Sequence, residues 1–421
     1  ARVKKFKPLP WFISLSLFLV FLLIFHTKRT TLTNSLLSLK VSGSSAYQVR
    51  IYVLYVWMLL LPFWLIISHV LMATSLALVI WHFIVKREDF NITPLKSFIP
   101  IFILFFGILI TNLIAHPGAL VDDTVNYLYF VLIPFVFIGI LKKDLTRIIR
   151  IFQAAIIFYV LILVIAVISR FSTLETSYSF GNFFFETVEQ YWHSSYLAGF
   201  ILVALLFQFA YKKITVLSFL AAIGSFTVLF ISQARLPLIV GVVLLLGLIV
   251  LKFPKKLKVK ALVVGTVLLI GGVFMVAKSQ TVQSKLTELL FTNQDSELDA
   301  RTALWKHAID EVKENIATGI GSENVRDVLA TKIEESSSIK YRRYNAHNQY
   351  LEYLLAYGIP VLLLFLSVLV LPFIRKLKYT MLFATYFGLV ILVESYLSRQ
   401  AGVVLFSIWY SFFIWYDSTD K

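Results

Sequence analysis

Cysteine is absent from the 421-residue chain, and charged residues are scarce. Without cysteine there is no disulfide, no cysteine-ligated zinc site and no cysteine nucleophile. Asp, Glu, Lys and Arg make up only 15% of the residues, hydrophobic residues make up 59%, and the mean hydropathy is +0.83. These values exclude an ordinary soluble globular protein. They are typical of a polytopic helical membrane protein.

Acidic residues are also outnumbered, with 23 Asp and Glu against 39 Lys and Arg, which gives a formal net charge of +16. The basic residues lie in short runs between apolar stretches rather than in one patch. In a membrane protein such runs are the signal that sets orientation. We therefore expect no nucleic-acid partner.

Apolar runs divide the chain into predicted spans, each of about 20 residues. The run 51–85 is long enough for two helices with a break near 62–69. Further spans are predicted at about 98–115, 122–141, 149–169, 193–211, 214–231, 236–252, 259–277, 349–373, 379–397 and 401–416. The predicted fold is all-α, a polytopic membrane bundle of about 12 transmembrane helices. It divides into a basic N-terminal segment (1–50), nine spans (51–277), a large loop with helix (278–348) and three last spans (349–421).

The first apolar run, residues 10–25, is short for a span and is flanked by basic residues. If it crossed the membrane, the basic N-terminal segment would lie outside, against the positive-inside rule. We therefore predict an interfacial or re-entrant helix on the cytoplasmic side. A true span with the N-terminal segment outside remains the alternative.

Orientation follows from basic runs that fall at alternate connections. The runs contain Lys142, Lys143, Arg147 and Arg150; Lys212 and Lys213; Lys252, Lys255, Lys256, Lys258 and Lys260; and Arg375, Lys376 and Lys378. The positive-inside rule makes these connections cytoplasmic. The loop 278–348 and the connections near 116–121 and 398–400 are then expected outside.

Ionisable side chains of the predicted spans collect at these outer ends. They are His193, Arg235, His347, Glu394 and Arg399, with Asp122 and Asp123 at the same level. Ionisable groups at membrane depth are costly and mark a pathway or a site. A coupled transporter places such groups at the midplane of the membrane on broken helices. Here the midplanes are mostly Leu, Ile, Val and Phe, so the functional face is predicted to be extracytoplasmic.

The loop 278–348 contains one clear amphipathic helix. Ser296 is a plausible N-cap, and the pattern Leu298, Trp305, Ile309, Val312 and Ile316 has helical spacing and ends at Gly319. Arg301 is predicted in the first turn, where a cation opposes the helix dipole unless an anion binds nearby. Pairing of Arg301 with Asp295, Glu297 or Asp299 is the alternative. Residues 323–345 show little periodicity, and the part after Thr331 is predicted to be a mobile segment.

A histidine stands where the chain enters the next span. Asn345 is predicted as the N-cap of that helix, with His347 in its first turn. The positive end of the helix dipole favours the neutral imidazole, which can accept a proton from a sugar hydroxyl. General-base catalysis of this kind contributes about 10²–10⁴ in rate. A histidine that only hydrogen-bonds near a helix start is the alternative.

The outer side has no spaced carboxylate pair of the kind that binds metal. Asp122 and Asp123 are adjacent, and adjacent residues of a helix do not converge on one ion. Glu186 and Glu189 stand in the predicted outer connection 170–192, where they could bind sugar hydroxyls or remain solvated. We therefore expect no metal and no cofactor.

The order of these motifs resembles the O-antigen ligase and polymerase superfamily. The motifs are Ser232-Gln-Ala-Arg235, Arg301-x-x-Leu-Trp305, Gly319-x-Gly321, and Asn345-Ala-His347-Asn348-x-Tyr350-Leu351 with Gly358. Trp192-His193-Ser-Ser-Tyr196-Leu-Ala-Gly199 and Glu394-Ser-Tyr-Leu-Ser-Arg399-Gln-Ala-Gly402 also resemble segments of that family. The resemblance covers about 51–413, and the first fifty residues and Gln233 add nothing to it.

The resemblance implies a metal-independent, inverting membrane glycosyltransferase. Its donor would be a glycan on undecaprenyl pyrophosphate, its acceptor a hydroxyl of lipid A-core or of another glycan, and its place the bacterial inner membrane with the site facing the periplasm. The family's essential arginines and histidine fall on Arg235, Arg301 and His347. Guanidinium groups suit a pyrophosphate leaving group because they bind its oxygens in a bidentate manner. Further substrate contacts are expected from Arg399, His193, Glu394, Asn348, Arg343 and Trp305, with Arg342 beside them.

Three alternatives stay open at the level of sequence. A polysaccharide polymerase or a protein O-oligosaccharyltransferase would share these motifs and differ only in the acceptor. A transporter of lipid-linked sugars belongs to another class. The one-sided placement of the polar groups, the lack of an internal repeat and the large outer loop count against the transporter.

Overall fold

The computed structural model describes residues 43–63, 65–85, 93–171, 194–207, 297–336 and 345–419, with a few isolated helical residues between 237 and 263. All elements in these ranges are helices, which confirms the all-α class. The apolar run 10–25 lies outside the described residues, as do all of the predicted span 214–231 and most residues of the predicted spans 236–252 and 259–277. The predicted number of about 12 spans is therefore not confirmed.

Four described helical segments are long and apolar enough to cross a membrane. By length and composition they are Ile67–Ile84, Pro94–Ala115, Lys142–Ala166 and Gln349–Ile374, and two shorter apolar helices cover Ala46–Leu60 and Tyr196–Leu206. Large apolar side chains on these helices stay exposed, for example Ile84, Ile114 and Leu363. Such faces suit contact with lipid. The helices thus support a multi-pass membrane protein.

The first described helices agree with the predicted break in the run 51–85. Helix α3 (Gly43–Leu60) and helix α4 (Leu65–Val85) pack against each other, and the chain turns between them at Pro62. A short 3₁₀ helix, η2 (Thr93–Phe98), then leads into α5 (Ile99–Ala115). Proline at the second position of α5 is compatible with a helix start, where its missing N–H has no partner to lose.

The predicted span 122–141 proves to be two short helices. They are α6 (Leu120–Tyr127) and α7 (Tyr129–Val136), and α7 contains Pro134 and ends two residues later. Helix α8 (Lys142–Phe171) begins at Lys142 rather than near 149. Its basic residues therefore form the first turns of a helix, where the sequence predicted a loop.

The last three helices surround the candidate site. Helix α17 (Gln349–Ile374) matches the predicted span, whereas α18 (Lys378–Val390) ends well before the predicted 397. A polar turn with the 3₁₀ helix η4 (Tyr396–Ser398) follows and leads into α19 (Gln400–Ser418). Residues 391–397, which the sequence predicted as the last turns of this span, are therefore not part of α18. They belong to the segment 391–399, which carries Glu394 and Arg399.

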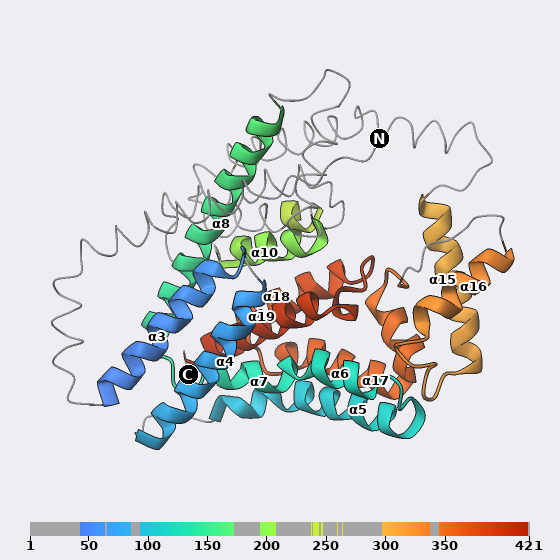
Figure 1. Ribbon diagram of the computed structural model, residues 1–421, viewed down its shortest axis with the longest axis horizontal. Helices are drawn as coiled ribbons and strands as arrows, with labels where there is room; N and C mark the ends of the chain where they lie inside the picture. The colour runs from blue at the N-terminus through green and yellow to red at the C-terminus, as the bar shows by residue number, and fades with distance from the viewer. Residues whose placement is uncertain are drawn as a thin grey trace.

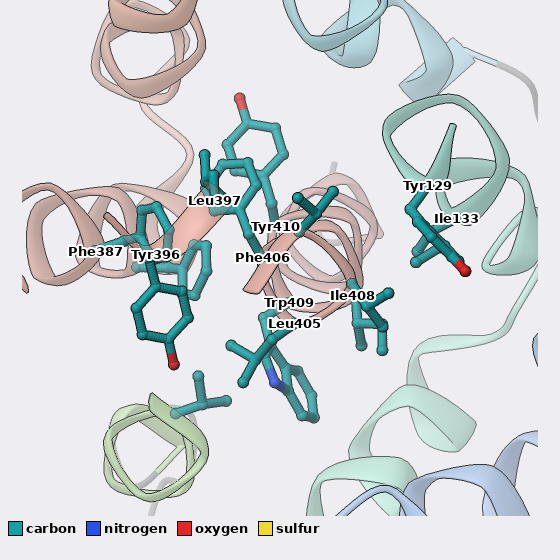
Figure 2. Packing of buried hydrophobic residues seen from close by; sticks show 14 of the residues in the cluster. Tyr129, Ile133, Phe387, Tyr396, Leu397, Leu405, Phe406, Ile408, Trp409 and Tyr410 are labelled. Carbon is teal, nitrogen blue, oxygen red and sulfur yellow. The ribbon is translucent and has the colours of Figure 1, made fainter. Parts of the chain in front are cut away.

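Helix α19 is the centre of the bundle. All of its residues from Gly402 to Asp417 are buried, and it packs against α18, α7 and α10 (Ser194–Leu206). Figure 2 shows Phe406, Trp409 and Tyr410 around this helix, with Phe387 and Tyr396 on one side and Tyr129 on another. A helix that is apolar on all sides must be covered on all sides. Helix α19 therefore forms the core of the described part of the bundle.

The large loop contains two described helices, α15 (Glu297–Glu314) and α16 (Val325–Ser336), which lie together at one end of the bundle (Figure 1). The predicted amphipathic helix is confirmed, but its buried face is Leu304, Ala308 and Val312, while Ile309 and Ile316 are about half exposed. The structure places a helix over residues 332–336, which the sequence predicted to be mobile. Residues 337–344 lie outside the described residues.

Glycines join the large loop to α17. Helix α17 unwinds at Gly358 (φ 75°, ψ −176°), which frees the carbonyls of Leu355 and Ala356. The amides of Ile320 and Gly321 donate to these carbonyls at 2.7 and 3.0 Å, and the Ile359 amide donates to the Ile316 carbonyl at 2.9 Å. A Cβ on Gly319 would lie 2.4 Å from the Leu355 carbonyl oxygen, and a Cβ on Gly358 would lie 2.4 Å from the Ala317 carbonyl oxygen. The motif glycines thus allow backbone to pack on backbone.

The bundle has two ends of different character. We call the end formed by residues 116–119, 315–324, 345–348 and 391–399 the loop end; there His116 Nε2 lies 2.9 Å from the Thr318 carbonyl. We call the other the basic end; there Arg375 donates to Ser97 Oγ at 2.8 Å and Lys142 lies over the Tyr416 ring. Segments that the sequence predicted on one side of the membrane thus lie at one end of the bundle.

Candidate functional site

The centre of the candidate site is the turn 345–348 that precedes α17. Asn348, not Asn345, is the N-cap: its Oδ1 accepts from the amides of Tyr350 (3.0 Å) and Leu351 (3.2 Å). The predicted cap is therefore wrong by three residues. His347 lies one residue before the cap and outside the first turn of the helix.

The backbone of His347 is strained. Its φ is +48°, a left-handed conformation that a residue with a Cβ seldom adopts. The Oδ1 of Asn345 accepts from the His347 amide at 3.2 Å, and the Nδ2 of Asn345 donates to Ser398 Oγ at 3.1 Å. Strained residues persist only where the surroundings determine them, and they concentrate at functional sites. The turn therefore holds the imidazole in a set position.

A carboxylate faces this imidazole. Glu394 Oε2 lies 3.7 Å from His347 Nδ1, and both side chains are about one-fifth to one-quarter exposed. A carboxylate beside Nδ1 favours a proton on that nitrogen and leaves Nε2 as the acceptor. In proteins without substrate such contacts are often longer than in the reacting complex. The pair can therefore present a basic Nε2 to a hydroxyl.

A second carboxylate, which the sequence analysis did not single out, connects the two turns of the site. Glu352 is 7% exposed, and its Oε2 accepts from the Ala346 amide (2.7 Å) and from Ser395 Oγ (3.2 Å). Ser395 Oγ also accepts from the Asn348 amide at 3.2 Å. Glu352 thus reaches back past the N-cap to an amide of the preceding turn, whereas the glutamate of a capping box stands one position earlier and binds the amide of the N-cap itself. The position of Glu352 in the first turn of the predicted span was the feature of the sequence that could have indicated this contact.

The same two turns are also joined by Gln349. Its amide donates to the Ile391 carbonyl at 2.9 Å, and its side-chain oxygen accepts from the Leu397 amide at 2.5 Å. Arg399 follows as the N-cap residue of α19; its backbone is extended, its side chain caps nothing, and it is exposed. His347, Glu394 and Arg399, which the sequence predicted as site residues, are thus carried by two turns bonded to each other.

The loop helix α15 also contacts this centre. The indole N–H of Trp305 donates to the Ala346 carbonyl at 2.9 Å, so the predicted site residue Trp305 holds the His347 turn against α15. Because α15 begins at Glu297, Arg301 lies at the start of the second turn rather than in the first. The dipole argument for an anion near Arg301 is weakened accordingly.

Asp123, in α6, connects the helices of the bundle to the large loop. It is 5% exposed, and its Oδ2 accepts from Asn112, Ser322 and Tyr357, each at 2.8 Å. Three donors satisfy a buried carboxylate oxygen. Asp123 is therefore a structural anchor of the loop and lies on other elements than the His347 turn.

Helices α15 and α16 hold each other by a salt bridge. Lys332 Nζ lies 2.5 Å from Glu311 Oε2, and Asn315 Nδ2 donates to Glu311 Oε1 at 2.9 Å. The hydrogen bond to Glu311 raises the pKa of Lys332 above its ordinary value. The salt bridge fixes the orientation of α16 on α15, and the hydrogen bond from Asn315 holds the Glu311 carboxylate within α15 and the residue that follows it.

Several predicted site residues cannot be placed. Arg235, His193 and Arg343 lie outside the described residues, as do Arg342, Glu186 and Glu189, and only the backbone of Arg301 is described. Over the described ranges no group of three or more His, Cys, Asp and Glu residues could hold a metal ion. The binding of pyrophosphate by Arg235 and Arg301 and the independence from metal stay predictions.

Comparison with known proteins gives one family. Residues 219–366 match the family described as O-antigen ligase, and no curated protein matches the chain. The matched segment contains Arg235, Arg301, Trp305 and His347, and it includes both α15 and α16 and the first part of α17. Over residues 219–366 the chain is therefore similar to the O-antigen ligase family, which confirms the resemblance found in the sequence over this segment.

Proposed function

We propose that the protein is a membrane glycosyltransferase that moves a glycan from undecaprenyl pyrophosphate to an acceptor hydroxyl, with O-antigen ligation to lipid A-core as the leading hypothesis. The observation that carries the proposal is His347, which lies on a strained turn inside the segment that matches O-antigen ligases and faces the Glu394 carboxylate at 3.7 Å. We place the reaction on the periplasmic side of the bacterial inner membrane, because the positive-inside rule assigns the basic end to the cytoplasm.

His347 is the general base in this mechanism. Its Nε2 accepts the proton of the acceptor hydroxyl while the hydroxyl oxygen attacks the anomeric carbon of the donor glycan. The bond from the anomeric carbon to the pyrophosphate oxygen breaks, and the pyrophosphate leaves with the electron pair. Attack from the face opposite the leaving group inverts the anomeric centre. Glu394 stabilises the imidazolium that forms.

The arginines bind the leaving group. Arg301 and Arg235 are assigned to the pyrophosphate from their motifs, and Arg399 and Arg343 support them. Guanidinium groups stabilise the charge that develops on the pyrophosphate oxygens as the bond breaks. We further assign substrate contacts to His193, to the free amide hydrogens of Asn348 Nδ2 and to the face of the Trp305 ring. This mechanism needs no metal, so EDTA should leave activity unchanged.

The alternatives differ in the acceptor or in class. A polysaccharide polymerase would use another lipid-linked glycan as acceptor, and a protein O-oligosaccharyltransferase would use a protein hydroxyl. Both would use the same general base and the same arginines for the pyrophosphate. A transporter of lipid-linked sugars would need no general base. The His347–Glu394 pair therefore favours a transferase over a transporter.

An in vitro transfer assay tests the proposal. Detergent-purified protein, with no gradient present, is supplied with an undecaprenyl-pyrophosphate-linked glycan and with either rough lipopolysaccharide or more lipid-linked glycan as acceptor. Product on lipid A-core establishes a ligase, and a ladder of longer lipid-linked chains establishes a polymerase. Absence of product with both acceptors, together with binding of the donor, would favour the protein-acceptor or transporter alternative.

A further inference from the structure

The buried carboxylate of Glu352 and the hydroxyl of Ser395 form a hydrogen-bonded bridge between the two site turns. Glu352 Oε2 accepts from the Ala346 amide at 2.7 Å and from Ser395 Oγ at 3.2 Å. The Asn348 amide donates to the same Ser395 Oγ at 3.2 Å. A serine hydroxyl donates one bond and can accept others, so these contacts are compatible with one another. We call them the Glu352–Ser395 bridge.

The bridge meets His347 and Glu394 through their neighbours in the chain. Ala346 and Asn348 stand directly before and after His347, and Ser395 directly follows Glu394. The amides on both sides of the imidazole-bearing residue are therefore bonded to the group that also holds the residue next to Glu394. A shift of either turn would break a bond of the bridge. The bridge thus fixes the two stretches of backbone from which His347 Nδ1 and Glu394 Oε2 come to 3.7 Å.

The bridge is covered, whereas the His347–Glu394 pair is partly exposed. Glu352 and Ser395 are 7% and 3% exposed, and the side chains of His347 and Glu394 remain 24% and 21% exposed. Burial of a carboxylate costs free energy unless hydrogen-bond donors replace the lost water. Both donors to Glu352 Oε2 belong to the site turns, so this compensation lasts only while the turns keep their relative position.

Two further contacts join the same turns at residues that lie further from Glu394. The side-chain oxygen of Gln349 accepts from the Leu397 amide, and Asn345 Nδ2 donates to Ser398 Oγ. These contacts do not involve the bridge, so they should hold the segment in place when a bond of the bridge is removed. Loss of the bridge is therefore expected to move the pair rather than to unfold the turns.

We propose that Glu352 and Ser395 are positioning residues of the transfer reaction, which hold the Glu394 carboxylate against His347 Nδ1 and do not contact the substrate. The inference rests on the proposed function, since it assumes that His347 accepts the proton of the acceptor hydroxyl. The imidazole gains a positive charge in that step, and its stabilisation by Glu394 depends on the distance between the two groups. The bridge therefore acts on kcat and leaves the binding of donor and acceptor unchanged.

The first test asks whether the bridge acts through Glu394. Ser395→Ala removes the hydroxyl of the bridge and is made in the wild type and in Glu394→Gln, which has no carboxylate to position. The measurements are kcat, both KM values and the melting temperature of the detergent-purified protein. We expect Ser395→Ala to lower kcat about tenfold in the wild type and less than about twofold in Glu394→Gln, because residues that act together are not additive. Ser407→Ala is the control, since this buried hydroxyl of α19 donates to the Val403 carbonyl of its own helix.

The second test uses two substitutions of Glu352. Glu352→Met removes the acceptor of both bonds at similar side-chain length, and it should lower kcat by up to about a hundredfold with little change in either KM. Glu352→Gln keeps an oxygen that can accept both bonds, so it should retain most of the activity. An equal loss in both variants would overturn positioning by hydrogen bonds and assign the effect to the charge of Glu352. Should Glu352→Met fail to fold, the measurements on Ser395→Ala decide alone.

Other results would also overturn the inference. Wild-type kcat in both Ser395→Ala and Glu352→Met would remove the bridge from the mechanism and leave the proposed function in place. An equal loss from Ser395→Ala in the wild type and in Glu394→Gln would show a purely structural serine. A rise in either KM at unchanged kcat would show that the bridge shapes substrate binding instead. Wild-type protein that transfers no glycan would overturn the proposed function and this inference together.

Discussion

The two ends of the bundle differ in how their polar groups are arranged. At the basic end the charged groups find protein partners: Asp417 accepts from the amides of Tyr379 and Thr380, and Arg50 donates to the carbonyls of Val136 and Ile138. At the loop end helix α17 is unwound at Gly358, and His347 Nδ1 lies 3.7 Å from Glu394 Oε2.

The difference separates a structural end from a functional end. Local rules of sequence and structure agree at the basic end, where carboxylates cap helices and arginines bind carbonyls. Each end has one described non-glycine residue with a left-handed backbone, Lys376 (φ 55°) at the basic end and His347 (φ 48°) at the loop end. The loop end differs in the helix break at Gly358 and in the imidazole that faces a carboxylate. The comparison predicts that substitutions at the loop end impair transfer, whereas substitutions at the basic end impair stability.

The largest effect is expected from His347→Ala. Removal of the general base should lower the transfer rate by about 10²–10⁴, the usual contribution of such a group. Because the turn is held by Asn345, Glu352 and Gln349, the protein should keep its melting temperature. The measurement is kcat of the detergent-purified protein beside thermal unfolding. His307→Ala, a histidine of α15, serves as the control, and full activity of His347→Ala would remove the base from the mechanism.

Gly358→Ala should disrupt the backbone hydrogen bonds between the large loop and α17. A methyl group there would lie 2.4 Å from the Ala317 carbonyl oxygen, and the residue would have to keep φ at +75°. The strain should cost about 3 kcal/mol and lower the melting temperature and the transfer rate together. Gly388→Ala is the matched control, since its added Cβ comes only to 3.3 Å of the Tyr350 hydroxyl. If Gly358→Ala unfolds like the wild type, the backbone pairing at this joint is not required.

Glu394→Gln tests whether the carboxylate supports His347. The amide keeps the size of the side chain but cannot stabilise an imidazolium at Nδ1, which lies 3.7 Å away. We expect kcat to fall about tenfold to a hundredfold, with a smaller change in the donor KM. Glu334→Gln, in the exposed face of α16, is the control. A rise in donor KM alone would show that Glu394 contacts the substrate instead.

The sequence was sufficient for the helical class and for placing the turns that carry His347, Glu394 and Arg399 at one end of the bundle. Hydropathy predicted the break after α3, the start of α17 and the extent of α19 within a few residues. Charge pattern predicted which connections share an end, and His347, Glu394 and Arg399 do come together on two bonded turns. These features follow from local composition and from the period of a helix.

The parts that the sequence did not predict depend on tertiary contacts. The cap of α17 is Asn348 because Asn345 is used by Ser398 and by the His347 amide. Helix α18 ends early because the segment 391–399 bonds to Gln349. Glu352 acquires its significance only from the Ala346 amide and the Ser395 hydroxyl that it faces across the fold. Such choices between equivalent local patterns are made by distant residues and leave no periodic signal.

The smallest effect on transfer is expected from Asp417→Asn at the basic end. The carboxylate accepts from the Thr380 hydroxyl at 2.7 Å and from the amides of Tyr379 and Thr380, so it caps the start of α18 from α19. Asparagine keeps one acceptor oxygen and brings donors that face other donors, which should cost about 1–2 kcal/mol. The melting temperature should fall while kcat and both KM values of the folded protein stay at the wild-type level. A selective loss of transfer in Asp417→Asn would break the division between the two ends, because α19 would then carry a change at one end to Arg399 at the other.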